Sequence, residues 1–343
     1  MHARMPKHFV LEERLERYAD AIETHPAAYA GRWAEACWPL EAPSGDGGRA
    51  PAGGAGHGEA EREQGRYQRV YLDLGCGKGA WLVEMARREP GSLFIGVDGE
   101  PVCIAYAAQH ILEAGVRNAL AVPGRAEQLP AMFAPGELSG ISLNFPTPAP
   151  KRRQAHTRLV TAEHLALLRP LLTPGAALTF RTDNEPLFAY ALPQFEAAGF
   201  ALLWASRDDR AEHPDVPLTE YEARMAAEGA RVLALCAVPT GPAPTPERLQ
   251  AARELPQSLY DYLPDDLFEG GYIPHGMGYG VTNLRRAKMR RQAAVWREPA
   301  AGTSAGAAGA ADAGSLAEAV PAAAEPAPTP DTAAGGGELP PIA

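Results

Sequence analysis

The sequence predicts an α/β fold in which a seven-stranded, mostly parallel sheet is covered by helices on both faces. Two observations predict this fold. Short apolar runs alternate along residues 67–241 with stretches whose apolar residues recur at helical spacing. The first run, residues 70–74, ends in three glycines at alternate positions, Gly75, Gly77 and Gly79, and a helical pattern begins directly after them. Such strand–helix alternation requires parallel strands between two layers of helices.

The elements follow one another in a regular order. The expected strands cover residues 70–74, 92–98, 119–123, 141–145, 177–180, 200–206 and 231–238. One expected helix begins directly after Gly79, and three more cover about residues 100–114, 162–172 and 185–197. An amphipathic helix is expected near residues 10–23, before the first strand.

Composition divides the chain into five parts. A lead-in segment, residues 1–41, precedes a flexible insertion rich in Gly, Ala and Pro, residues 42–66, and then the α/β domain, residues 67–241. An appended segment with a basic end, residues 242–297, follows, and a tail of Ala, Gly and Pro, residues 298–343, is expected to be disordered because it cannot bury a core.

The composition favours a cytoplasmic protein. Hydrophobic residues make up 46% and charged residues 22% of the 343 residues, and the four cysteines show neither a CxxC pair nor metal-ligand spacing. No apolar run approaches the roughly 20 residues that span a membrane, so neither a membrane nor a metal is an expected partner. The net charge of −10 does not exclude RNA, because five acids and no Lys or Arg lie after residue 300. Monomer and homodimer both remain open.

Two acids stand where a nucleoside-like ligand would meet the sheet. Asp98 ends the second strand about 20 residues after the glycines, a position that suits a carboxylate on ribose hydroxyls. Asp73 precedes the first glycine and would contact the ligand or hold the turn. The glycines allow a sharp turn and close approach of the backbone to a ligand. Lys78 lacks the following Ser or Thr of a phosphate-binding loop, which argues against ATP hydrolysis.

The segment from Leu143 to Arg153, LNFPTPAPKRR, follows the fourth strand, where open α/β sheets place their substrates. It resembles the tRNA (guanine-N7)-methyltransferase family, whose mark here is N-F-P-D-P-W-P-K followed by a basic run. The resemblance extends in order through the Gly75–Gly79 loop, Arg181–Asn184 and Thr219–Glu222. Several matched blocks in order are more specific than a glycine triplet alone.

The resemblance implies a Rossmann-like fold, S-adenosyl-L-methionine as cofactor and tRNA as partner. It implies cofactor contacts at Asp73, Asp98 and the glycines Gly75, Gly77 and Gly79, with Asp73 on the amino-acid part of the cofactor. Substrate contacts are implied at Lys151, Asp183, Thr219 and Glu222. The resemblance thus predicts an enzyme that methylates N7 of a guanine in tRNA.

Several positions of the implied site differ from the family pattern. The aspartate between the two prolines is Thr147, the tryptophan is Ala149, and the acid expected to meet the adenine falls at Arg125. Guanine N7 has a free lone pair, so its methylation needs alignment rather than a general base. Loss of a carboxylate that stabilises the positive product ring costs about 2–4 kcal/mol. We therefore assign Thr147 and Asp183 as the candidate catalytic residues, with Asp183 and Glu222 as substitutes for the missing aspartate.

Alternatives remain at each level. Asp183 could instead cap the helix that starts near Glu185, and Thr219 could cap the helix that contains Tyr221. The basic residues from Arg285 to Arg291 form either a solvated helix face or a clamp for RNA phosphates. The alternative functions are a methyltransferase acting on another RNA or a small molecule, and a non-catalytic tRNA-binding paralogue.

Overall fold

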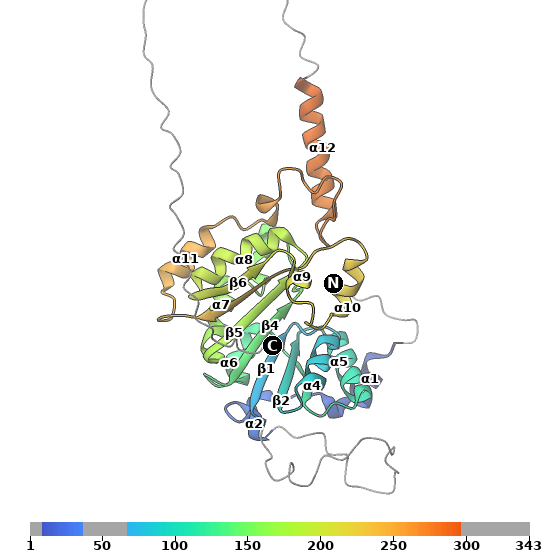
Figure 1. Cartoon of the computed structure of the whole chain (residues 1–343), viewed down its shortest axis with the longest axis vertical. Helices are drawn as coiled ribbons and strands as arrows, with labels where there is room; N and C mark the ends of the chain where they lie inside the picture. The colour runs from blue at the N-terminus through green and yellow to red at the C-terminus, as the bar shows by residue number, and fades with distance from the viewer. Residues whose placement is uncertain (1–8, 37–66, 296–343) are drawn as a thin grey trace, which may run out of the picture. The chain divides into compact units, whose positions relative to one another are not determined.

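The computed structural model describes residues 9–36 and 67–295 of the chain, and it forms the expected seven-stranded sheet (Figure 1). The strand order is β3-β2-β1-β4-β5-β7-β6. The strands are β1 (Arg69–Leu74), β2 (Ser92–Asp98), β3 (Ala119–Pro123), β4 (Leu138–Asn144), β5 (Leu172–Thr182), β6 (Phe200–Ser206) and β7 (Leu233–Pro239). β1 to β5 are parallel, whereas β7 runs antiparallel to both β5 and β6. The predicted fold class is confirmed.

Helices occupy the intervals that the apolar spacing indicates. The α-helices of the described residues are α1 (Leu11–Arg17), α2 (Trp33–Ala36), α4 (Ala80–Arg88), α5 (Pro101–Ala114), α6 (Leu129–Met132), α7 (Ala162–Leu168), α8 (Glu185–Ala197), α9 (Asp209–Glu212), α10 (Glu220–Ala226), α11 (Pro246–Glu254) and α12 (Gly278–Val295). Short 3-10 helices complete the set: η1 (Ala19–Ala21), η2 (Pro26–Tyr29), η3 (Ala126–Gln128), η4 (Arg152–Thr157), η5 (Arg169–Leu171) and η6 (Leu259–Tyr262).

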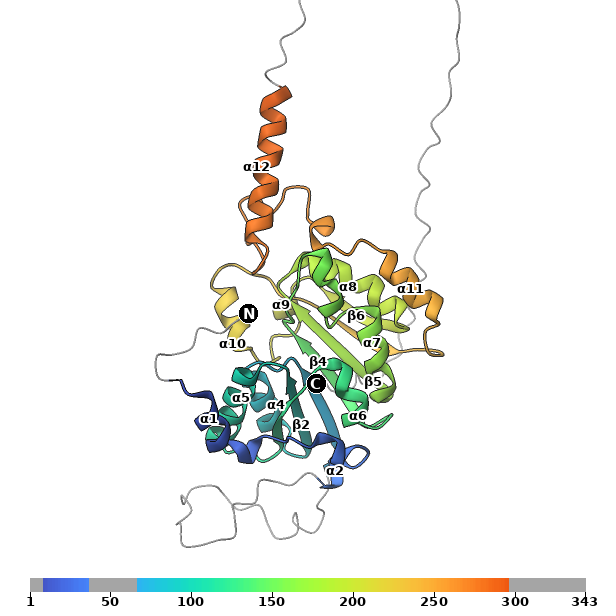
Figure 2. The same ribbon diagram turned by 180° about the vertical axis from the view of Figure 1, so that it is seen from behind.

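The alternation of side chains along the strands divides the core into two layers. Tyr71 and Phe94 pack with α4 and α5 in one apolar cluster, while Leu72 and Ile95 belong to the cluster that contains α6, α7 and α8. Both views show α1 beside α5, α4 on the other side of α5, and α11 beside α7 and α8 (Figures 1 and 2). Helices therefore cover both faces, as predicted.

The segment that the sequence predicts as an appendage contributes to the core of the domain up to Arg285. Ala252, Leu259, Met277 and Val281 are buried in the same cluster as the central strands. These apolar side chains come from α11, η6, the residue before α12 and the first turn of α12, and their burial ties the segment to the sheet.

The chain divides into two compact units at Arg285 and Arg286. The described part of the second unit is the continuation of α12, residues 286–295. The predicted insertion at 42–66 and the predicted tail at 298–343 lie outside the described residues. Within residues 9–36 and 67–295, no helix combines the length and apolar character needed to cross a bilayer.

Candidate active site

The strand order reverses between β1 and β4, which places the glycine loop next to the segment that resembles the family. β2 and β3 lie on one side of β1, whereas β4 and β5 lie on the other. In open parallel sheets, this reversal opens a crevice at the carboxyl ends of the strands, where ligands bind. The loops after β1 and β4 meet at this crevice, together with the loop after β5.

The glycine loop needs its glycines for the turn and for helix packing. Gly77 has a φ of +54° and donates its N–H to Asp98 Oδ2 at 2.9 Å. A Cβ on Gly79 would lie 2.9 Å from Ala107 Cβ of α5. The third glycine thus allows α5 to pack against the loop, whereas a Cβ on Gly77 would meet no atom within 4 Å. The open space beside Gly77 is therefore compatible with the predicted close approach of the backbone to a ligand. At Gly79, glycine is required by the packing of α5 instead.

Asp73 is buried at the end of β1 beside Asn144 of β4. Asn144 Nδ2 donates to Asp73 Oδ1 at 3.2 Å, and Asn144 Oδ1 is buried with no hydrogen-bond partner among the described residues. The pKa of the Asp73 carboxyl is raised to about 7, chiefly by burial; the hydrogen bond from Asn144 opposes the rise, the nearby Asp98 adds to it and Arg181 opposes it. A buried carboxylate and an unsatisfied amide oxygen together form an acceptor pair that suits a cationic donor.

Asp98 is held by the backbone on both oxygens. Oδ2 accepts the Gly77 N–H and Oδ1 accepts the Glu100 N–H at 2.8 Å. Burial raises the pKa of Asp98, while these two backbone hydrogen bonds oppose the rise. Arg125 is exposed and its side chain lies along Gly99, where a Cβ would be 3.4 Å from Arg125 Cγ. The structure thus brings Arg125 next to the Asp98 turn.

The loop after β4 is fixed in an unusual backbone conformation. Phe145 and Ala149 have φ values of 51° and 44°, which are rare for residues with a side chain. Arg158 is buried and donates to the Ala149 carbonyl through Nη2 at 2.8 Å and through Nε at 3.2 Å. Thr147 and Lys151 are exposed in this loop and at its end. Arg158, which continues the basic run in sequence, is therefore an anchor of the loop.

Asp183 follows β5 and accepts two phenol hydroxyls. Tyr221 Oη donates to Asp183 Oδ2 at 3.1 Å, and Tyr272 Oη donates to the same oxygen at 2.5 Å. The Tyr221 ring centroid lies 5.3 Å from that of Phe145, which connects this cluster to the loop after β4. Asp183 does not cap α8, because Asn184 Oδ1 accepts the Leu187 N–H instead.

Thr219 and Glu222 have structural partners in α10. Thr219 Oγ1 accepts the Glu222 N–H at 2.9 Å and caps the helix, as the alternative interpretation predicts. Glu222 is buried and paired with Arg210, whose Nε donates to Oε1 at 3.0 Å. Lys78 of the glycine loop forms an ion pair with Glu220 at 3.0 Å and so links α10 to the loop.

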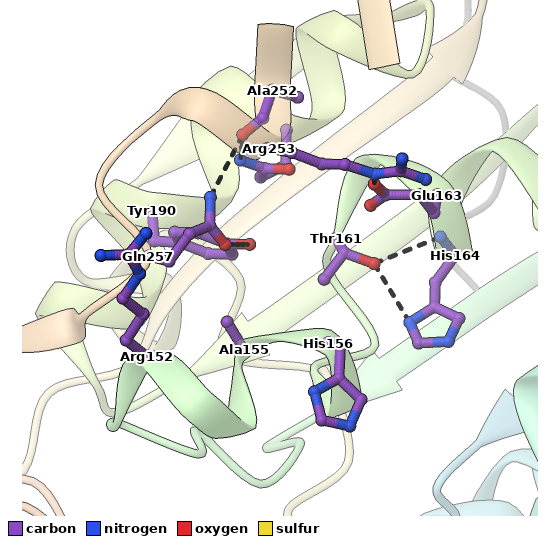
Figure 3. Close-up of a pocket in the computed structure, with 11 residues that line it drawn as sticks. Arg152, Ala155, His156, Thr161, Glu163, His164, Tyr190, Ala252, Arg253 and Gln257 are labelled. Carbon is purple, nitrogen blue, oxygen red and sulfur yellow. Dashed lines mark hydrogen bonds and ion pairs between the residues drawn. The ribbon is translucent and has the colours of Figure 1, made fainter. Parts of the chain in front are cut away.

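A separate cavity of about 460 Å³ lies between η4, α7, α8 and α11 (Figure 3). Within it, Thr161 Oγ1 contacts His164 Nδ1 at 3.1 Å, and Arg253 pairs with Glu163. Its lining consists of Arg152, Ala155, His156, Thr161, Glu163, His164, Tyr190, Gln194, Ala252, Arg253 and Gln257. None of the predicted site residues lines this cavity.

The crevice fits S-adenosylmethionine through its donor and acceptor chemistry. The acceptor pair of Asp73 and Asn144 matches an ammonium group, and the Asp98 oxygens retain lone pairs for ribose hydroxyls. In the part of the chain that the structure describes, no group of three or more His, Cys, Asp or Glu side chains is arranged to hold a metal ion.

Three residues of the site were not predicted as contacts in it. Tyr272 contacts Asp183 from a distant part of the sequence. Arg210 contacts the buried Glu222, and the buried Arg158 contacts the Ala149 carbonyl. The Gly and aromatic composition of residues 270–280 is the only local signal that precedes the Tyr272 contact.

The chain is similar to known methyltransferases over this domain. Residues 67–235 match the family model described as "Putative methyltransferase". The tRNA (guanine-N(7)-)-methyltransferase of Geobacillus kaustophilus is 34% identical over 169 residues, which are 49% of this chain and 78% of the relative. The enzyme of the same name from Lacticaseibacillus casei is 33% identical over 185 residues, covering 53% of this chain and 85% of the relative.

Among solved structures, the 16S rRNA methyltransferase KamB is 21% identical with a TM-score of 0.42, covering 54% of this chain and 96% of that chain. The sequence relatives are the stronger finding, since the matched region spans more than two thirds of each of them. The chain belongs to the tRNA (guanine-N7)-methyltransferase family.

Proposed function

We propose that this protein transfers a methyl group from S-adenosylmethionine to N7 of a guanine in tRNA. The observation that best supports the proposal is the meeting of the glycine loop, the loop after β4 and Asp183 at the reversal of strand order. The named activity of the relatives points to the same reaction. A cytoplasmic location, where tRNA is made and used, accords with this proposal.

The residues divide between the two substrates. Asp73 with Asn144 would receive the ammonium group of the cofactor, Asp98 would receive the ribose hydroxyls, and Arg125 would meet the adenine. Bound S-adenosylmethionine supplies an electrophilic sulfonium methyl group. Asp183 stabilises the positive charge that the guanine ring gains, the task of the family aspartate that is Thr147 here. Exposed Thr147 and Lys151 contact the tRNA from the loop, and Thr219 and Glu222 hold α10 beside Asp183.

The direct test is mass spectrometry of tRNA nucleosides after incubation with the protein and isotopically labelled cofactor. The tRNA comes from a strain that lacks its own enzyme of this family, so that the target guanine is unmodified. Labelled 7-methylguanosine is the expected product. Label in another nucleoside would favour the alternative substrate, and cofactor binding without any single-turnover transfer would favour a non-catalytic paralogue.

Cofactor affinity should depend on pH through Asp73. Because the pKa of free Asp73 is about 7, the carboxyl is increasingly protonated below that pH and loses its attraction for an ammonium group. The dissociation constant should therefore rise by up to about tenfold per pH unit between pH 7 and 5.5. Isothermal titration calorimetry at several pH values measures this dissociation constant. The Asp73→Asn variant should bind weakly at all pH values, and a flat profile for the unaltered protein would contradict the assignment.

The basic part of α12 is proposed to bind tRNA phosphates. Arg286, Lys288, Arg290 and Arg291 are exposed in the second unit. We leave Arg285 out of the proposed clamp, because its Nε and Nη2 donate to the Leu267 carbonyl at 3.0 and 2.7 Å. It stabilises a turn in which Leu267 has a φ of 53°.

Replacing Arg286, Arg290 and Arg291 by Gln should weaken tRNA binding and lower its salt dependence. Each lost phosphate contact reduces the slope of log K against log salt concentration by about 0.7–0.9. Filter binding at several salt concentrations measures this slope. Replacing three exposed arginines elsewhere, Arg17, Arg117 and Arg231, removes the same charge as a control. An equal slope for both triple variants would rule out the clamp.

A further inference from the structure

Tyr272 brings a hydroxyl from outside the family match to the proposed active site. The match to the family model ends at residue 235, and Tyr272 lies in the segment that follows. Its hydroxyl donates to Asp183 Oδ2 at 2.5 Å and lies 3.3 Å from Met225 Sδ of α10. Residues that follow β7 therefore complete the surroundings of Asp183.

The segment around Tyr272 is held against the domain by buried contacts. Met277 is fully buried, and Asn184 Nδ2 contacts its Sδ at 3.2 Å. Asn184 is the residue after Asp183 and caps α8. The same short stretch of chain thus receives contacts from both Tyr272 and Met277, which fixes the position of Tyr272 relative to Asp183.

The two phenols that contact Asp183 act as donors to one oxygen only. Burial raises the pKa of both Tyr221 and Tyr272, and the Asp183 carboxylate raises it further, so both hydroxyls keep their protons. Within residues 9–36 and 67–295, no hydrogen bond to Asp183 Oδ1 is found. The arrangement fixes the rotation of the carboxylate and leaves Oδ1 to accept a donor from a ligand.

We propose that Tyr272 is a positioning residue that orients Asp183 so that Oδ1 accepts an N–H group of the substrate guanine. The inference rests on the proposed function. Guanine offers N1–H and an exocyclic amino group as donors, while N7 is an acceptor that must remain free for methylation. A carboxylate held by two phenols has lost its rotational freedom before substrate binds, which lowers the entropic cost of binding.

The test is the kinetics of the Tyr272→Phe variant, which keeps the ring and removes the hydroxyl. With unmodified tRNA, kcat/KM for tRNA should fall about tenfold, as expected for loss of a hydrogen bond to a charged group. The KM for S-adenosylmethionine should stay within about twofold, a split that general unfolding would not produce. The control is Tyr262→Phe. It removes a hydroxyl in the same segment, and this hydroxyl donates to the Pro256 carbonyl rather than to Asp183.

A double-mutant cycle separates positioning of Asp183 from other effects. In the Asp183→Ala background, Tyr272→Phe should change kcat/KM less than about twofold, because the group that it orients is gone. A full tenfold effect in that background overturns the inference. So does a Tyr272→Phe single variant as active as the unaltered protein, or a faster one, which would mean that Tyr272 blocks the site. An unaltered protein that does not methylate tRNA overturns the proposed function and this inference together.

Discussion

Replacing Asp183 by Ala should lower kcat for methyl transfer to tRNA about 100- to 1,000-fold, the effect of removing one preorganised charged group from a site. Asp183 is buried, accepts two phenol hydroxyls and lies in the same aromatic cluster as the loop after β4. The chain has Thr147 where the family has an aspartate, so no second carboxylate of that loop compensates. Single-turnover methylation of unmodified tRNA measures the rate.

Cofactor binding provides the internal control for this variant. Asp183→Ala should bind S-adenosylmethionine within about twofold of the unaltered protein, because Asp73 and Asp98 remain. Asp266→Ala is a matched variant, since Asp266 Oδ1 accepts a backbone N–H from Phe268 at an exposed turn. A rate reduced less than fivefold by Asp183→Ala would exclude Asp183 as the catalytic carboxylate.

Replacing Asp209 by Ala should lower the free energy of unfolding by about 3–5 kcal/mol, because it leaves a buried guanidinium without a counter-charge. Arg181 and Asp209 are 2% and 1% exposed and paired at 2.8 Å between Nε and Oδ2. Arg181 Nη1 and Nη2 are buried without partners in the described residues, so Asp209 is the carboxylate that balances this charge. The midpoint of thermal unfolding should fall by about 10 °C.

An exposed ion pair of the same kind provides the comparison. Glu185 and Arg207 are paired at 2.6 Å with side chains 40% and 73% exposed, so Glu185→Ala should cost less than about 1 kcal/mol. The double variant Arg181→Met with Asp209→Leu should recover most of the stability, because no unpaired charge remains. Equal midpoints for Asp209→Ala and Glu185→Ala would show that the buried pair contributes no more than an exposed one.

Much of the fold could be predicted because it depends on local pattern. β2, β3, β6 and α8 have the bounds that the apolar spacing gives. The bounds of β5 could not be predicted, since its first half, with Pro174 and Gly175, has no apolar alternation and is paired only through β4. The end of the domain was also missed, because burial of Leu259 and Val281 depends on tertiary packing rather than on their neighbours in sequence.

The site residues that could be predicted from the sequence are those at the ends of strands. Asp73, Asp98 and Asp183 each lie at the end of a parallel strand, which brings them to one edge of the sheet. Their partners were not predictable. Arg210 reaches Glu222 from the preceding helix, and Tyr272 reaches Asp183 from 89 residues further along the chain. No periodicity or spacing encodes such pairs; only the folded backbone determines them.

Burial of the segment after β7 also constrains how the domain is made. Because Leu259, Met277 and Val281 fill the same core as the central strands, a nascent chain that has reached only β7 lacks part of its hydrophobic interior. The packing of this interior is complete only when residues near 281 have been synthesised. The surroundings of Asp183 are therefore complete only after this segment has been made, and a chain stopped at residue 241 would lose both stability and Tyr272.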